Sequence, residues 1–202
     1  MRRILSYIFA VILFCGVSGF AATGTAEPQK SKEHNEEQTL QKPNTDERKA
    51  TLLSEEIRHQ LLQLPYYGVF DWLSGEVRPD GTVILDGEVV RPTTKSDAEK
   101  RVKKVEGVTE VVNNIEVLPL SMNDDQIRRA TYRAIYNPNS PLFEYALRAV
   151  PPIHIIVKNG NVTLKGVVLN EMDRQLAETA ARGVANTFDV KNELSVEKKV
   201  SN

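Results

Sequence analysis

Cysteine is almost absent from this sequence: Cys15 is the only one among 202 residues, and it lies in an apolar N-terminal run. A chain with one cysteine forms no internal disulfide, so a packed core must supply the stability of the folded protein. Lipid modification of Cys15 is not expected, because a lipoprotein signal needs a small residue just before the cysteine and Phe14 occupies that position.

An excess of either charge is also absent. The 26 lysines and arginines nearly balance the 27 aspartates and glutamates, which gives a formal net charge of -1. General nucleic-acid binders carry a basic excess or a basic stripe. We therefore expect no nucleic acid among the partners of this protein.

Motifs of catalysis and of cofactor binding are absent as well. The sequence has no Gly-x-Ser-x-Gly nucleophile elbow and no glycine loop that would bind a dinucleotide or a phosphate. No two of the histidines, His34, His59 and His154, have the spacing of metal ligands. We expect no enzyme, no cofactor, no metal and no small-molecule substrate. We interpret His154 as a strand residue with a hydrogen-bonded ring, with a ligand or pH sensor as the alternative.

Residues 1–26 have the pattern of an export signal. Arg2 and Arg3 precede an apolar stretch over 4–20, and small residues follow at 21–26, where a signal peptidase cleaves. We expect cleavage and export to the periplasm or cell envelope. The alternative is an uncleaved N-terminal membrane anchor, for which the apolar stretch is short, since a span needs roughly 20 residues.

Residues 27–49 contain few apolar side chains, and Leu40 is the only sizeable one. Such a segment buries too little surface to offset the entropy lost on ordering, so we predict a flexible linker. An interaction arm is the alternative interpretation.

An internal repeat fills the rest of the chain. A shift of 79 positions places residues 80–118 on residues 159–197 without a gap. The identical pairs are mostly apolar residues and glycines: Gly81 and Gly160, Val83 and Val162, Leu85 and Leu164, Gly87 and Gly166, Val89 and Val168, Ala98 and Ala177, Val105 and Val184, Val111 and Val190, Asn113 and Asn192, and Val117 and Val196. Repetition of core and turn positions indicates a duplicated folding unit. The sequence therefore predicts two domains, over 50–119 and 121–199.

Each copy has the same predicted order of elements. Asp80-Gly81 and Asn159-Gly160 predict two-residue hairpin turns, which need positive φ at both central residues. Alternating apolar residues predict strands on both sides of each turn and a third strand near the end of each copy. Gly87 and Gly166 interrupt the second strands, and we interpret them as positions where the following helix packs closely.

Helices are predicted before and after each hairpin. Leu53, Ile57, Leu61 and Leu64 form the apolar stripe of the first helix. The cap of its counterpart in the second copy is predicted at Asn123, Asp124 and Asp125, and Pro92 and Asn170 are predicted to begin the helices after the hairpins, which Gly107 and Asn186 end. The predicted fold class is α+β, with two tandem αββαβ modules, each a small three-stranded mixed sheet with helices packed on one face.

These features resemble the BON domain, a bacterial module named for osmotically induced and nodulation proteins. The resemblance rests on the hairpin over 159–168 (NGNVTLKGVV), the alanine-bearing helix after it and the closing strand over 188–194 (FDVKNEL). The first copy carries the same frame over 80–89 (DGTVILDGEV) and over 105–108 (VEGV). The resemblance covers roughly residues 50 to 199.

The resemblance implies a function only by analogy. BON proteins are exported, often carry the domain in tandem, and are associated with envelope stress, osmotic stress and phospholipid surfaces. By this analogy we expect a non-catalytic periplasmic protein whose modules contact phospholipid surfaces in envelope maintenance or stress protection. The alternative is a protein-interaction or chaperone-like scaffold for another envelope protein.

Two groups of residues are candidates for binding lipid or a partner. The first is a basic and aromatic group on the helix that opens the second module: Arg128, Arg129, Tyr132 and Arg133. Arginine and tyrosine suit anionic headgroups, and the alternative is an ordinary solvated helix face. The second is the aromatic run Tyr66, Tyr67, Phe70 and Trp72. An exposed run would form a sticky patch, whereas a buried run would close the core of the first module.

Overall fold

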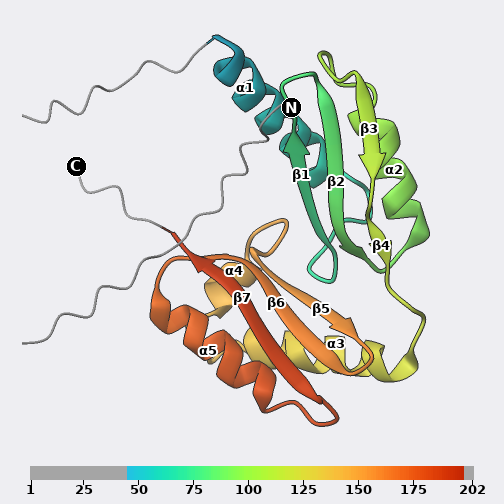
Figure 1. Cartoon of the computed structure of the whole chain (residues 1–202). Helices are drawn as coiled ribbons and strands as arrows, with labels where there is room; N and C mark the ends of the chain where they lie inside the picture. Colours follow the sequence, from blue (N-terminus) through green and yellow to red (C-terminus); the bar gives the residue numbers. More distant parts are fainter. Residues whose placement is uncertain (1–44, 198–202) are drawn as a thin grey trace, which may run out of the picture. The chain divides into compact units, whose positions relative to one another are not determined.

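The computed structural model describes residues 45–197 (Figure 1). The predicted export signal and all but the end of the predicted linker lie outside these residues. Within the described residues, no helix is long and apolar enough to cross a membrane.

The first module consists of two helices and a mixed sheet. Its elements are α1 (Thr45–Leu62), β1 (Trp72–Val77), β2 (Thr82–Val89), α2 (Pro92–Val102), β3 (Glu110–Asn113) and β4 (Glu116–Val117). Strands β1 and β2 form an antiparallel hairpin, and α2 makes the crossover after which β3 and β4 pair parallel to β2. Helices α1 and α2 lie on the same face of the sheet (Figure 1).

The second module repeats this plan with one extra short helix. Its elements are α3 (Met122–Ile135), α4 (Phe143–Ala146), β5 (Ile153–Lys158), β6 (Asn161–Val168), α5 (Glu171–Arg182) and β7 (Asp189–Val196). The strand order is β5-β6-β7, with an antiparallel hairpin and a parallel closing strand. The prediction of two tandem αββαβ modules is confirmed.

Each module has its own core between helices and sheet. The first core contains Ile57, Leu61 and Leu64 of the predicted stripe, together with the alternating Val83, Leu85 and Val89 of β2. The second contains the equivalent residues of β6, Val162, Leu164 and Val168, packed against α3 and α5. The duplicated apolar positions are therefore the ones that the sheets bury against their helices.

A repeated asparagine ties the closing strand of each module to the helix before it. The Asn113 side-chain amide donates to the backbone oxygen of Lys95 and to the Glu99 carboxylate, at 3.2 and 3.0 Å. Asn192 donates in the same way to Arg174 and Glu178, at 3.0 and 3.1 Å. These bonds explain why an asparagine occupies both copies, at the point where the strand of the first module divides into β3 and β4.

The first hairpin turn differs from its prediction. At the second turn Asn159 and Gly160 both have positive φ, 51° and 77°, as the predicted two-residue turn requires. At the first turn Arg78 pairs with Thr82, and Pro79, Asp80 and Gly81 form a three-residue loop in which only Gly81 has positive φ. Asp80 instead accepts a hydrogen bond from the backbone N–H of Thr82, which stabilises the longer loop.

Gly87 and Gly166 approach the neighbouring strand segment rather than a helix, so their predicted packing against helices is wrong. A Cβ atom on Gly87 would lie 2.0 Å from the backbone oxygen of Trp72, and one on Gly166 would lie 1.9 Å from that of Pro152. Both glycines also have positive φ, 133° and 127°. The backbone of the entering strand thus excludes any side chain at these two positions.

The helix ends also differ in part from their predictions. Asn170 caps α5 by accepting from the backbone N–H of Asp173, as predicted, and Pro92 lies in the first turn of α2. The cap of α3 is Ser121, whose hydroxyl accepts from the backbone N–H of Asp124. Helices α2 and α5 end at Val102 and Arg182, before Gly107 and Asn186, which lie in the following turns with positive φ.

Candidate functional site

One acidic and one basic residue on the inner side of α3, Asp124 and Arg128, are buried against the hairpin of the second module. Asp124 is 1% exposed, and its carboxylate accepts from the backbone N–H groups of Asn159 and Gly160 at 2.9 and 2.8 Å. Arg128 is 3% exposed and donates to the backbone oxygen of Val157 at 2.7 Å. These bonds fix α3 to the end of β5 and to the turn that follows it.

Arg128 is therefore not available to a ligand, and its prediction as a contact residue is wrong. Its guanidinium also pairs with Asp125, one helical turn earlier. The buried stripe of α3 contains Asp124, Ile127, Arg128, Thr131 and Ile135. Arg128 lies inside this stripe, so its guanidinium donates to a backbone oxygen of the sheet instead of facing solvent.

Arg129 and Arg133 lie on the opposite side of α3 and are exposed. They are one helical turn apart, and no ion pair of either residue is recorded within the described part of the chain. Leu120 and Met122, at the start of the helix, are 98% and 83% exposed. Met122 lies two turns before Arg129 on the same side of α3, whereas Leu120 precedes the helix, so the outer side of α3 combines two cations with one exposed apolar side chain.

Tyr132 contributes little to this outer side, because it is half-buried. Its ring packs against those of Phe70 and Tyr136, with centroids 6.2 and 4.9 Å away. Tyr132 and Phe70 both pack against the core of the second module. Of the predicted basic and aromatic group, only the two outer arginines are placed to contact a surface.

The aromatic run over 66–72 is divided among several environments. Tyr66 is exposed, and the guanidinium of Arg91 lies 4.6 Å from its ring centroid. Tyr67 packs against the core of the first module, and Phe70 against that of the second. Trp72 is half-buried at the start of β1. Three of the four aromatic side chains are thus covered, so the run does not form a continuous exposed patch.

His154 is enclosed by two rings of that run. It is 5% exposed, and its ring centroid lies 5.6 Å from that of Tyr67 and 5.2 Å from that of Trp72. Its Nδ1 atom is buried and has no hydrogen-bond partner among the described residues, so the prediction of a fully hydrogen-bonded ring is wrong. Burial lowers the pKa of His154, and the backbone of Asp71 and Gly68 partly offsets this effect.

Asp71 holds the loop around this histidine. It is 5% exposed and accepts from the backbone N–H groups of Val90 and Gly68 at 2.7 and 3.1 Å. Burial raises the pKa of its carboxyl, which the two hydrogen bonds partly oppose. Asp71 was not predicted as a structural residue, because nothing in the local sequence pattern indicates that its side chain turns inward.

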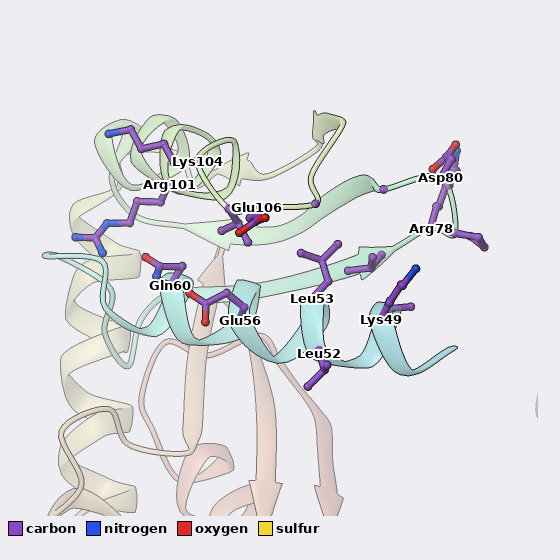
Figure 2. A pocket seen from close by; sticks show the side chains of 16 residues that line it. Lys49, Leu52, Leu53, Glu56, Gln60, Arg78, Asp80, Arg101, Lys104 and Glu106 are labelled. Carbon is purple, nitrogen blue, oxygen red and sulfur yellow. Dashed lines mark hydrogen bonds between the residues drawn. The ribbon is translucent and has the colours of Figure 1, made fainter. Parts of the chain in front are cut away.

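The first module carries an open cleft of about 1180 Å³ (Figure 2). The cleft lies between α1, the turn from β1 to β2, and the segment that follows α2. Half-buried Leu53, Val77 and Val105 supply its apolar wall. Its charged lining residues are Lys49, Arg78, Arg101, Lys104, Glu56, Asp80 and Glu106. None of these residues was predicted as a site, because α1, the hairpin turn, α2 and the segment after α2 contribute them from separate parts of the sequence.

Among the described residues, no group of three or more histidine, cysteine, aspartate or glutamate side chains could hold a metal ion. The carboxylates with shifted pKa values other than Asp71 serve local structure. Hydrogen bonds from Thr82 lower the pKa of Asp80, and those from Asn192 and Arg182 lower the pKa of Glu178.

Comparison with known proteins identifies a family. The family model of the BON domain matches residues 53–119 and 123–198. No curated protein matches the chain. Two solved structures of CdsD, a structural protein of the type III secretion system of Chlamydia trachomatis, are similar at low identity.

The CdsD structures resemble this chain only weakly. The C-terminal domain is 14% identical with a TM-score of 0.25, and the match covers 71% of this chain and 96% of that chain. The other structure is 15% identical with a TM-score of 0.26, covering 73% and 94%. At these TM-scores the likeness carries no argument about function.

Proposed function

This chain belongs to the BON domain family, and from that membership we propose that it is a non-catalytic, exported protein of the cell envelope that contacts phospholipid surfaces. The family model matches both modules and so covers most of the chain. The basic n-region and apolar run of residues 1–26 support export. A role in envelope maintenance or in protection against stress is part of the same proposal.

The outer side of α3 is the observation that supports this proposal best. Arg129 and Arg133 face solvent one turn apart, whereas Arg128, which precedes them in the sequence, is buried and bonded to the backbone oxygen of Val157 and to Asp125. A basic side chain near an anionic membrane surface contributes about 1 kcal/mol of binding free energy. The exposed Leu120 and Met122 add apolar surface that can enter the interface between headgroups and acyl chains.

Charge removal on this helix tests the site. Residues 27–202, the form expected after export, would be sedimented with vesicles of phosphatidylglycerol and phosphatidylcholine, and the variant Arg129→Ala plus Arg133→Ala compared with the native sequence. We expect the variant to lose about thirtyfold in vesicle affinity, since two cations at about 1 kcal/mol each are removed.

A matched control removes the same number of positive charges from a different part of the protein. Lys100→Ala plus Lys103→Ala removes two exposed cations from α2 of the first module and the residue that caps it. The control should keep the native affinity for vesicles. Equal losses in the two variants would mean that net charge, and not the outer side of α3, governs binding.

The covered aromatic run weakens the alternative of a scaffold that captures another envelope protein through these rings. Only Tyr66 of the four side chains is exposed, and it lies beside Arg91. The surface proposal therefore takes precedence over the protein-interaction alternative.

A further inference from the structure

The cleft of the first module differs from the corresponding region of the second module in two ways. The 79-residue shift of the internal repeat places Ala180 and Gly183 at the positions of Arg101 and Lys104. The second module thus lacks both cations that α2 and its following turn bring to the cleft. The two copies therefore differ in charge at these two positions.

The second difference concerns the hairpin turn that closes one end of this region. In the second module, the Asp124 carboxylate reaches from α3 to the turn and accepts two backbone hydrogen bonds. In the first module, the α1 residues that line the cleft beside the turn are Lys49, Ala50 and Leu53. None of these side chains can accept a hydrogen bond, so no carboxylate bridge of this kind forms and the region stays open.

Arg101 and Lys104, at the other end of the cleft, differ in their charge partners from the neighbouring lysines. Lys100 of α2 and Lys103, which follows its end, pair with Asp97 and Glu99, at 3.6 and 2.6 Å. No ion pair is recorded for Arg101 or Lys104 in the described part of the chain, although both line the cleft. In Figure 2 they project from the α2 side, opposite Glu56 and Gln60 of α1.

The balance of charges around the cleft restricts what it can bind. Four cations and three carboxylates line it, an excess of one positive charge. Two of the carboxylates have hydrogen bonds within the protein: Asp80 accepts from Thr82, and Glu56 accepts from Gln60. A ligand with one negative charge matches this excess, whereas Glu56 and Glu106 would repel a polyanion.

We propose that this cleft binds a single molecule of an anionic amphiphile with one alkyl chain and a carboxylate head. The head lies against Arg101 and Lys104, where charge-assisted hydrogen bonds are available. The alkyl chain lies along Leu53, Val77 and Val105, toward the hairpin turn of the first module. The corresponding turn of the second module is the one that bonds to Asp124. A concave cleft accepts one such molecule, which a flat bilayer surface cannot enter.

Titration with a soluble amphiphile tests this site directly. Uniformly ¹⁵N-labelled residues 27–202 would be titrated with sodium decanoate below its critical micelle concentration, and the backbone amide shifts followed by NMR. We expect saturable shifts over residues 49–53, 77–81 and 101–107. Decyltrimethylammonium, with the same alkyl chain and the opposite charge, and acetate, with the head alone, should give no saturable shifts there.

Two charge variants in α2 and the turn after it locate the head. Arg101→Ala plus Lys104→Ala should weaken decanoate binding by more than about tenfold, because both charge-assisted contacts to the head are lost. Lys100→Ala plus Lys103→Ala should bind as the native protein does. Circular dichroism checks that both variants remain folded, and both substitute exposed or half-exposed side chains.

Three results would overturn the proposal: no saturable shift with decanoate, shifts that map to the second module, or equal weakening in the two variants. Binding of the cationic amphiphile at equal affinity would do the same, since it would leave the arginine and lysine without a role. The test is separate from that of the membrane surface, because Arg129→Ala plus Arg133→Ala should leave decanoate binding unchanged.

Discussion

At the scale of single residues, Asp124 and Arg128 anchor the first helix of the second module to its sheet. Both side chains are almost fully buried, and between them they bind backbone groups of Val157, Asn159 and Gly160. Buried charges are tolerated only when hydrogen bonds replace the water they have lost. The pair therefore makes the turn and the helix dependent on each other.

Replacement of Asp124 should destabilise the protein strongly. Asp124→Ala leaves the N–H groups of Asn159 and Gly160 without their acceptor, at a cost of roughly 1–3 kcal/mol for each buried group left unpaired. We expect a loss of about 3 kcal/mol in the free energy of unfolding, measured with urea. Asn123→Ala, at the exposed neighbouring position, is the control and should change it by less than about 0.5 kcal/mol. A neutral result for Asp124→Ala would contradict the anchoring role.

His154 should make stability depend on pH. Burial lowers its pKa below the ordinary value of 6.5, so the unfolded chain takes up a proton at higher pH than the folded protein does. The contribution of the neutral ring is complete above pH 6.5 and is lost as pH falls from there toward the folded pKa. The slope from one such ring is at most about 1.4 kcal/mol per pH unit.

The variant His154→Phe removes the titrating group and keeps an aromatic ring. Urea unfolding between about pH 7 and pH 5.5 should then show a flatter dependence than the native protein. Asp71, whose pKa is raised from 3.8, acts in the opposite direction, because the folded state takes up its proton first as pH falls. An unchanged slope in the variant would show that His154 does not titrate differently in the two states.

At the scale of elements, the closing strands depend on the repeated asparagines. Asn113 and Asn192 each bond to the preceding helix, and each also accepts from the backbone N–H two residues later, at 3.2 Å in both copies. One side chain thus holds a helix and a strand in register. The same contacts recur in both modules, and these hydrogen bonds satisfy the polar side chain of each asparagine at its half-buried position.

Substitution of either asparagine should therefore have similar effects. Asn113→Ala and Asn192→Ala should each lower the free energy of unfolding by about 1–3 kcal/mol, since several partly buried backbone groups lose partners. Amide hydrogen exchange would locate the effect, with faster exchange expected at β3 and β4 in one variant and at β7 in the other. Faster exchange spread evenly over both modules would contradict a local role.

The repeat made the elements predictable, and the exceptions have physical causes. Turn and core residues recur at one spacing, so helices, hairpins and closing strands follow from the pattern. The first turn departs from it because Pro79 and Asp80 support a longer loop. The buried side of α3 was misjudged because Asp124 and Arg128 occupy core positions with polar side chains, which hydrophobic periodicity cannot detect.

At the scale of the whole molecule, the two modules touch through the segment that precedes β1 and through charged residues of both sheets. The backbone N–H of Ile155 donates to the oxygen of Val69 at 2.8 Å. Lys165 donates to both carboxylate oxygens of Glu88, at 2.8 and 2.9 Å. The aromatic run thus serves the joining of the modules, a role that depends on tertiary contacts and was not predictable from one copy of the repeat.

The proposed binding sites lie on different modules, and this separation gives each module its own role. In the two proposals, the outer side of α3 would present Arg129 and Arg133 to a membrane surface, and the cleft of the first module would accept a single amphiphile. Binding to a surface through two cations depends on ionic strength, because at 0.1 M salt the interactions between exposed charges more than about 10 Å apart are largely screened. A protein interface made of apolar groups would not respond in this way.

Sedimentation of residues 27–202 with anionic and neutral vesicles, at low and high salt, tests the central claim most directly. The account predicts retention on phosphatidylglycerol vesicles at low salt, little retention on phosphatidylcholine vesicles, and release from the anionic vesicles as salt rises. Absence of retention on anionic vesicles at low salt, or retention that ignores both lipid charge and salt, would contradict it.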